Sequence, residues 1–99
     1  MKKPQWIHVH GRRWRDRVNG NTYHSVMIWV DGEVFKHIPF TYGYGGQWEW
    51  TAAHWLVQEG YLTDCHPDYP GGSSLFSLSV DNHTIITTDL DDVARKKDL

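Results

Sequence analysis

Two histidines at strand spacing are the residues best suited to chemistry in this chain. His8 and His10 lie two apart in a stretch that alternates polar and apolar residues, so a strand would place both imidazoles on one face. Such a pair can ligate a metal ion when a third group joins it, here His24 or His37. No Cys/His pair stands nearby, and ordinary surface histidines account for the same pattern. We therefore expect no metal site and no cofactor.

The remaining reactive residue types do not form a catalytic pattern. Cys65 and His66 are adjacent, and adjacent side chains rarely aim at each other as a nucleophile and its base must. The glycine-rich stretch Tyr42–Gly46 precedes an expected helix and so could present backbone amides to a phosphate. It lacks the lysine of a phosphate-binding loop and the spacing of the dinucleotide fingerprint. We predict that the protein is not an enzyme.

Aromatic residues and glycines are concentrated between Phe40 and Trp55. Tyr and Trp offer large, stiff contact area with a polar tip, and glycine lets a backbone approach a partner closely. This composition is typical of recognition surfaces. We expect a partner to contact the exposed aromatic residues of this segment and two acids of the loop expected at 61–72. These residues are Tyr42, Tyr44, Trp48, Asp64 and Asp68.

Charge is segregated along the chain, although its net value is only −2. Both ends are basic, whereas residues 18–94 are acidic and contain Lys36 as their single lysine or arginine. An acidic body attracts a basic partner, or pairs with the basic ends of its own chain. The alternative function is nucleic-acid binding by a basic loop, with phosphates on the arginines and a base stacked on the tryptophan. The residues of that alternative site are Arg12, Arg13, Trp14, Arg15 and Arg17.

The length of 99 residues indicates a single domain, with residues 1–4 and 96–99 as flexible ends. A lone cysteine, Cys65, cannot form an internal disulfide. The chain has no apolar run long enough to cross a membrane, and its start lacks a hydrophobic signal segment. We expect a cytoplasmic protein that does not associate with membranes.

Hydrophobic periodicity and turn residues predict the elements that must position these residues. In order, they are a strand at 5–10 ended by Gly11, a basic loop at 12–21, a hairpin of strands 22–30 and 33–40 around Asp31-Gly32, a helix at 47–59 capped by Gly60, a loop at 61–72, a second hairpin of strands 75–80 and 84–88, and a short helix within 89–97. This order predicts an α+β fold: a mostly antiparallel sheet of about five strands packed against one main helix, with a short C-terminal helix.

The first hairpin has two apolar faces. A two-residue loop would pair Val30 with Glu33 and Ile28 with Phe35. We expect a helix to cover one face. The other face is then either covered by a remaining segment or left as a binding surface.

Three segments carry a resemblance to a known family. They are Gly20–Val26 (GNTYHSV), Asp31–Glu33 (DGE) and Tyr42–Ala52 (YGYGxQWxxTA). Over roughly residues 12–61 the chain resembles a family of small uncharacterised proteins carried by tailed bacteriophages and prophages. The resemblance implies a phage accessory protein, many of which bind a host defence protein. On this basis the chain would bind and inhibit a host protein in the bacterial cytoplasm, as an anti-CRISPR-type inhibitor of a defence complex or nucleic-acid enzyme does.

A second resemblance bears on the nucleic-acid alternative. The segments His24–Gly32, Gly43–Gly45 and Ala52–Leu56 are similar to the hairpin-to-helix half of double-stranded-RNA-binding domains. That family places paired lysines on the phosphates at the start of its helix. The corresponding segment here, Gly46–Glu49, has no basic residue. The alternative therefore depends on the arginines of the basic loop.

Overall fold

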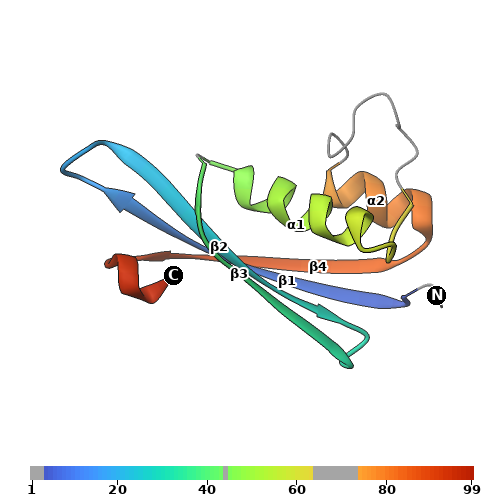
Figure 1. Ribbon diagram of the computed structural model, residues 1–99. Coiled ribbons are helices and arrows are strands. Elements are labelled where there is room, and N and C mark those ends of the chain that lie inside the picture. Colours follow the sequence, from blue (N-terminus) through green and yellow to red (C-terminus); the bar gives the residue numbers. More distant parts are fainter. Residues whose placement is uncertain (1–3, 44, 64–73) are drawn as a thin grey trace.

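The computed structural model describes residues 4–43, 45–63 and 74–99, which form a four-stranded sheet with two α-helices on one side (Figure 1). Its elements in chain order are β1 (Trp6–Asp16), β2 (Asn21–Val30), β3 (Val34–Tyr42), α1 (Gln47–Gln58), α2 (Leu75–Asn82), β4 (Ile85–Val93) and the 3-10 turn η1 (Lys96–Asp98). The strand order is β3-β2-β1-β4. Strands β1, β2 and β3 pair antiparallel, whereas β4 pairs parallel to β1.

The predicted α+β class is confirmed, but the sheet is mixed and has four described strands where about five were expected. The predicted second hairpin is wrong, because Leu75–Asn82 is helix α2. The Ser74 side chain accepts a hydrogen bond from the Ser77 backbone N–H and so caps its start, and His83 ends it in a left-handed conformation (φ 54°). The short C-terminal helix predicted within 89–97 is displaced: β4 runs to Val93, and the 3-10 helix η1 follows only at Lys96–Asp98.

Strand β1 does not stop at Gly11 as the sequence suggested, but continues to Asp16. Gly11 faces the ring of Trp48, and a Cβ atom built on it would lie 2.5 Å from Trp48 Cε3. The glycine therefore provides room for a close approach of α1 rather than a chain break. As a consequence, the basic segment from Arg12 onward is largely a strand and not a loop.

The register of the β2–β3 hairpin differs by one residue from the prediction. Asp31 and Gly32 have positive φ (51° and 71°), and the Glu33 N–H donates to the Val30 carbonyl, as the two-residue turn requires. Glu33 is nevertheless an extra residue, because Val30 pairs with Val34. This one-residue shift places Phe35 opposite Trp29, with ring centroids 5.3 Å apart.

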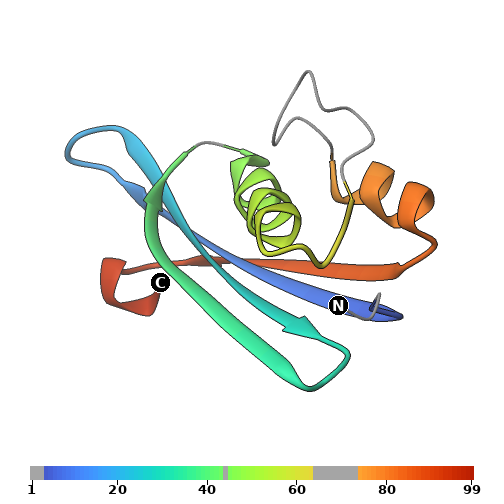
Figure 2. The same ribbon diagram turned by 45° about the vertical axis from the view of Figure 1, so that its right-hand side comes forward.

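The core lies between the sheet and the two helices (Figure 2). Alternate residues of β1 and β2 face it, because successive strand side chains point to opposite sides. Its principal members are Ile7, Val9, Val26, Ile28, Val30, Trp48, Ala52, Ala53, Leu56, Leu75 and Leu78. Among the described residues, no helix is long and apolar enough to span a membrane.

Candidate binding surface

The sheet face opposite α1 and α2, here called the far face, carries aromatic side chains from three neighbouring strands. Because Ile7, Val9, Val26 and Ile28 point into the core, the residues that alternate with them point the other way. The aromatic residues of the far face are Trp6, Trp14, Tyr23, Trp29, Phe35, Phe40 and Tyr42.

These side chains form two rows across the strands. The first aromatic row is Trp6, His8, Trp29 and Phe35, whose successive ring centroids lie 6.3, 5.6 and 5.3 Å apart. The second aromatic row is Trp14, Tyr23, Phe40 and Tyr42, in which Tyr23 lies 5.8 Å from Trp14, 4.3 Å from Phe40 and 5.6 Å from Tyr42. Strand register explains the neighbours across strands, which are His8–Trp29, Trp29–Phe35, Trp14–Tyr23 and Tyr23–Tyr42. Trp6 and Phe40 join the rows because each lies two residues from a row member on its own strand, and so on the same face.

Both rows present apolar surface to solvent. Trp6 and Phe35 of the first row are 43% and 54% exposed, and Phe40 and Tyr42 of the second row are 43% and 54% exposed. Contiguous exposed aromatic area of this kind is unusual for a surface that stays in water. The rings are fixed on paired strands, so a partner would meet a preformed surface.

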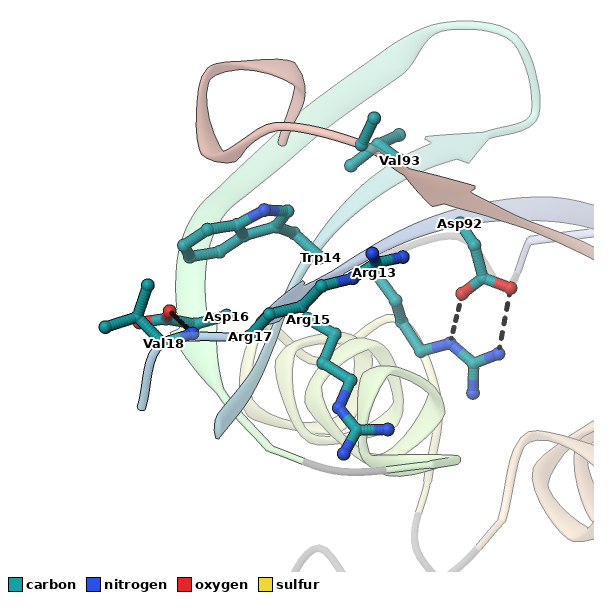
Figure 3. Close-up of a pocket in the computed structure, with 9 residues that line it drawn as sticks. Arg13, Trp14, Arg15, Asp16, Arg17, Val18, Asp92 and Val93 are labelled. Carbon is teal, nitrogen blue, oxygen red and sulfur yellow. Dashed lines mark hydrogen bonds and ion pairs between the residues drawn. The ribbon is translucent and has the colours of Figure 1, made fainter. Parts of the chain in front are cut away.

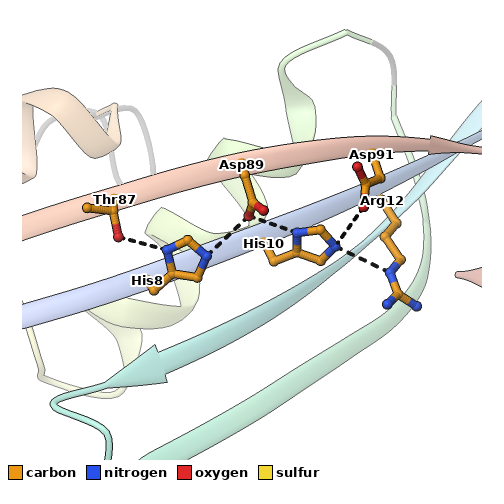
Figure 4. A network of polar contacts seen from close by, with 6 residues as sticks. All are labelled: His8, His10, Arg12, Thr87, Asp89 and Asp91. Atoms are coloured by element: carbon orange, nitrogen blue, oxygen red, sulfur yellow. Dashed lines mark hydrogen bonds and ion pairs between the residues drawn. The ribbon is translucent and has the colours of Figure 1, made fainter.

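A polar network borders the rows where β1 runs beside β4 (Figure 4). Asp89 Oδ1 lies 3.2 Å from His8 Nε2 and 2.8 Å from His10 Nδ1. His8 Nδ1 lies 2.7 Å from Thr87 Oγ1, and Arg12 Nε lies 3.4 Å from His10 Nε2. Both imidazoles can donate a hydrogen bond to Asp89, and the hydroxyl of Thr87 can donate to His8 Nδ1. His10 Nε2 also lies 3.5 Å from Asp91 Oδ2.

The polar network lowers the pKa of Asp89. The hydrogen bond from His10 is the largest cause that holds the pKa of Asp89 below its usual value, with smaller contributions from the charges of His10 and His8.

His24, considered above as a third metal ligand, is buried on the other side of the sheet, where its Nε2 lies 2.8 Å from Thr51 Oγ1. The described part of the chain contains no group of three or more His, Cys, Asp or Glu placed to hold a metal ion.

The arginines expected to form one basic site are divided between the two sides of β1. Arg12 and Trp14 belong to the far face, whereas Arg13 and Arg15 point to the helix side (Figure 3). Arg13 forms an ion pair with Asp92 at 3.0 Å and donates to the Gly45 carbonyl at 3.1 Å. Alternation along a strand separates neighbouring residues in this way, whereas a loop could have gathered them.

A groove lies at this end of β1. Its volume is 670 Å³, and its lining residues are Arg13, Trp14, Arg15, Asp16, Arg17, Val18, Asp92, Val93 and Ala94 (Figure 3). Asp16 is used in the adjoining turn, where it accepts hydrogen bonds from Val18 N and Asn19 N. Within the described residues, the side chains of Arg15 and Arg17 have no hydrogen-bond or ion-pair partner. They are thus the cations of the groove that remain available to an anion.

The partner-binding residues expected from sequence have three different outcomes. Tyr42 lies in the second aromatic row, and its side chain has contacts within the protein. Trp48 is 6% exposed and packs on Gly11 in the core, so it cannot be a surface anchor in this structure. Tyr44, Asp64 and Asp68 lie outside the described residues.

Sequence reasoning placed the aromatic surface at the strand-to-helix junction and missed most of the residues that the structure exposes. Trp6, Trp29, Phe35 and Phe40 all lie on strands. In the sequence, these aromatic residues were indicated by the alternation pattern that makes both faces of the first hairpin apolar. That pattern identifies two faces but does not specify which one the helices cover.

Comparison of the chain with protein-family models, with curated proteins and with solved structures gives no match. The geometry of the far face and of the groove is therefore what bears on function.

Proposed function

We propose that this protein is a non-enzymatic binding protein that recognises a partner protein through the far face of its sheet. The observation that carries the proposal is the pair of aromatic rows, four of whose members are 43–54% exposed. Aromatic side chains are the most frequent anchors of protein interfaces, because they bury a large area with little loss of side-chain entropy. Their exposure in the free chain costs solvation free energy that a partner would recover.

Charge next to the rows supports a basic partner. Asp89 and Asp91 lie on β4, which is an edge strand, and their side chains are 57% and 69% exposed. Exposed acids beside an aromatic surface speed the encounter with a basic surface and oppose an acidic one. The sequence resemblance adds the prediction that the partner is a bacterial host protein, such as a nucleic-acid enzyme or a defence complex, and that binding inhibits it.

Capture from bacterial lysate tests the proposal. The tagged wild-type chain should retain a protein that Phe35→Ala and Phe40→Ala retain poorly, because each variant removes one exposed ring from a different row. Phe76→Ala is the matched control, since Phe76 is 78% exposed on α2, on the opposite side of the sheet. Circular dichroism should confirm that all three variants fold. Equal capture by the wild type and both far-face variants would refute the proposal.

The groove favours a second candidate, binding of nucleic acid. The side chains of Arg15 and Arg17 line it without partners among the described residues, and Trp14 lines it from the far face. Phosphates would contact the two guanidinium groups, and an unpaired base would stack on the indole. This site is smaller than the basic loop expected from sequence, because Arg13 is held by Asp92.

Fluorescence anisotropy with labelled single-stranded and duplex oligonucleotides tests this second candidate. Arg15→Gln and Arg17→Gln should each reduce the slope of log affinity against log salt by about one unit, because each variant removes one cation from a phosphate. Lys36→Gln, on β3, is the control and should leave the slope unchanged. If no oligonucleotide binds micromolar protein at low salt, the second candidate is eliminated.

A further inference from the structure

The C-terminal turn, which is η1 (Lys96–Asp98), folds back onto the side of the sheet opposite the two helices (Figures 1 and 2). Lys96 Nζ lies 4.7 Å from the ring centroid of Phe40, a member of the second aromatic row. Arg12 Nη1 donates a hydrogen bond of 3.1 Å to the carbonyl of Asp98. A segment of the chain itself thus occupies part of the far face.

The turn is closed mainly by its own hydrogen bonds. The Asp98 N–H donates to the Arg95 carbonyl at 3.0 Å, the Leu99 N–H donates to the Lys96 carbonyl at 3.2 Å, and Arg95 Nε donates to Asp98 Oδ2 at 3.3 Å. It reaches the sheet through the contact of Lys96 with Phe40 and the hydrogen bond from Arg12 to Asp98. A cation–π contact and a single hydrogen bond each contribute little, so another segment can compete for the same place.

The surroundings of Lys96 suit an ammonium group. The Phe40 ring stacks on Tyr23 at 4.3 Å with an interplanar angle of 22°, and its π-system attracts a cation. Asp16, the last residue of β1, adds a carboxylate that interacts with the charge of Lys96. The side chain of Asn19 is the largest cause that holds the pKa of Asp16 below its usual value, and the positive charge of Lys96 contributes in the same direction.

We propose that the Phe40 end of the second aromatic row is a site for a lysine-bearing segment of the partner protein, and that Lys96 of the C-terminal turn occupies this site until the partner displaces it. This inference rests on the proposed function and specifies the chemistry of the partner. Two observations support it: a lysine of this chain already lies on the ring, and the carboxylate of Asp16 interacts with the charge of that lysine.

Nuclear magnetic resonance of the full chain tests whether the lysine contact exists in solution. A side chain above an aromatic ring experiences the ring current, so the ε-methylene protons of Lys96 should resonate upfield of those of Lys97. In Phe40→Leu the two lysines should become alike. Phe35→Leu, which changes the first aromatic row, should leave the shift of Lys96 in place. If Lys96 and Lys97 are already alike in the wild type, the proposed self-occupied site is wrong.

A peptide competition tests whether the site accepts a lysine from outside. The probe is the acetylated peptide Ala-Arg-Lys-Lys-Asp-Leu, which copies residues 94–99, and its control has glutamine at both lysine positions. The full-length Lys96→Gln variant should bind the lysine peptide about two- to fivefold more tightly than the glutamine peptide, as a cation–π contact at an exposed site predicts. The Lys96→Gln, Phe40→Leu double variant should lose this preference.

Equal binding of the two peptides by Lys96→Gln would overturn the inference. That result would leave the proposed function intact if Phe35→Ala still reduced capture of the partner protein, because Phe35 belongs to the first aromatic row. Conversely, a lysine preference without any effect of Phe35→Ala on capture would support the lysine site while contradicting the broader interface.

Discussion

Gly11 shows how one small residue determines the placement of a large one. A Cβ atom at Gly11 would lie 2.5 Å from Trp48 Cε3 and 2.6 Å from Trp48 Cδ2, which is closer than such atoms approach in folded proteins. Trp48 is buried among the core residues of α1. The glycine therefore fixes the distance between β1 and α1, and it keeps this tryptophan out of the set of surface aromatics.

We expect Gly11→Ala to lower the free energy of unfolding by about 1–3 kcal/mol, as overpacking of a core contact does. Urea denaturation monitored by circular dichroism measures this change. Gly46→Ala is the control, because a Cβ atom there would meet nothing closer than Glu49 Oε2 at 3.6 Å. Equal stability of Gly11→Ala and the wild type would show that α1 does not pack on β1 in this way.

His24 should make stability depend on pH. Burial is the largest cause that lowers the pKa of His24 below 6.5. As the pH falls below 6.5, the unfolded chain binds a proton before the folded chain does. The free energy of unfolding should therefore decrease from this pH downward until the folded-state pKa is passed.

Urea unfolding at a series of pH values measures this dependence. His24→Gln should reduce the slope between the folded-state pKa and pH 6.5. His83→Gln changes an exposed histidine and is the control, so it should leave the slope of the unfolding free energy against pH unchanged. An unchanged slope in His24→Gln would mean that this histidine is solvated in the folded protein.

At the scale of elements, local signals were sufficient for the hairpin and for α1. Asp31-Gly32 predicted the turn of the β2–β3 hairpin, and the 3.6-residue periodicity before Gly60 predicted a helix that the structure places at Gln47–Gln58. The extra residue Glu33 was not predictable from the turn residues, because the packing of Val34 and Phe35 on opposite faces selects the register.

Pairing of β1 with β4 was beyond local reasoning. The two strands are far apart in sequence, since Trp6 pairs with Ile85. Their parallel direction follows from the path of the chain through α2. The same pairing brings Asp89 to His8 and His10 and thereby assembles the polar network. The alternation of residues predicted that the two histidines share a face, but not which acid they meet.

Asn82 of α2 holds Thr63, which follows α1 in the sequence. This side chain is 4% exposed; its Oδ1 accepts from the Thr63 N–H at 2.9 Å, and its Nδ2 donates to the Thr63 carbonyl at 3.0 Å. Asn82→Ala would leave both backbone groups of Thr63 without this partner. We expect a loss of about 1–3 kcal/mol in the free energy of unfolding, measured by urea denaturation.

Asn19→Ala is a suitable comparison for Asn82→Ala, because Asn19 is exposed in the turn between β1 and β2. Its substitution should change stability by about 0.5 kcal/mol or less. Similar values for the two variants would indicate that the buried amide contributes nothing specific to the packing of α2.

At the scale of the whole molecule, the two faces of the sheet differ in what they contact. One face packs on α1 and α2 and forms the core, while the other carries two rows of rings bordered by Asp89 and Asp91. The C-terminal turn covers part of the second row through Lys96. This division explains how a chain of 99 residues can bury part of its aromatic residues in a core and leave others exposed on the far face.

The dissociation constant of the captured partner protein for three variants tests the central claim most directly. Phe35→Ala and Phe40→Ala should each weaken binding about thirtyfold, as expected for removal of an anchor worth about 2 kcal/mol. Phe76→Ala, on the helix side, should bind within about twofold of the wild type, as expected outside an interface. If Phe35→Ala and Phe40→Ala are folded and both bind as tightly as the wild type, the far face is not the recognition surface.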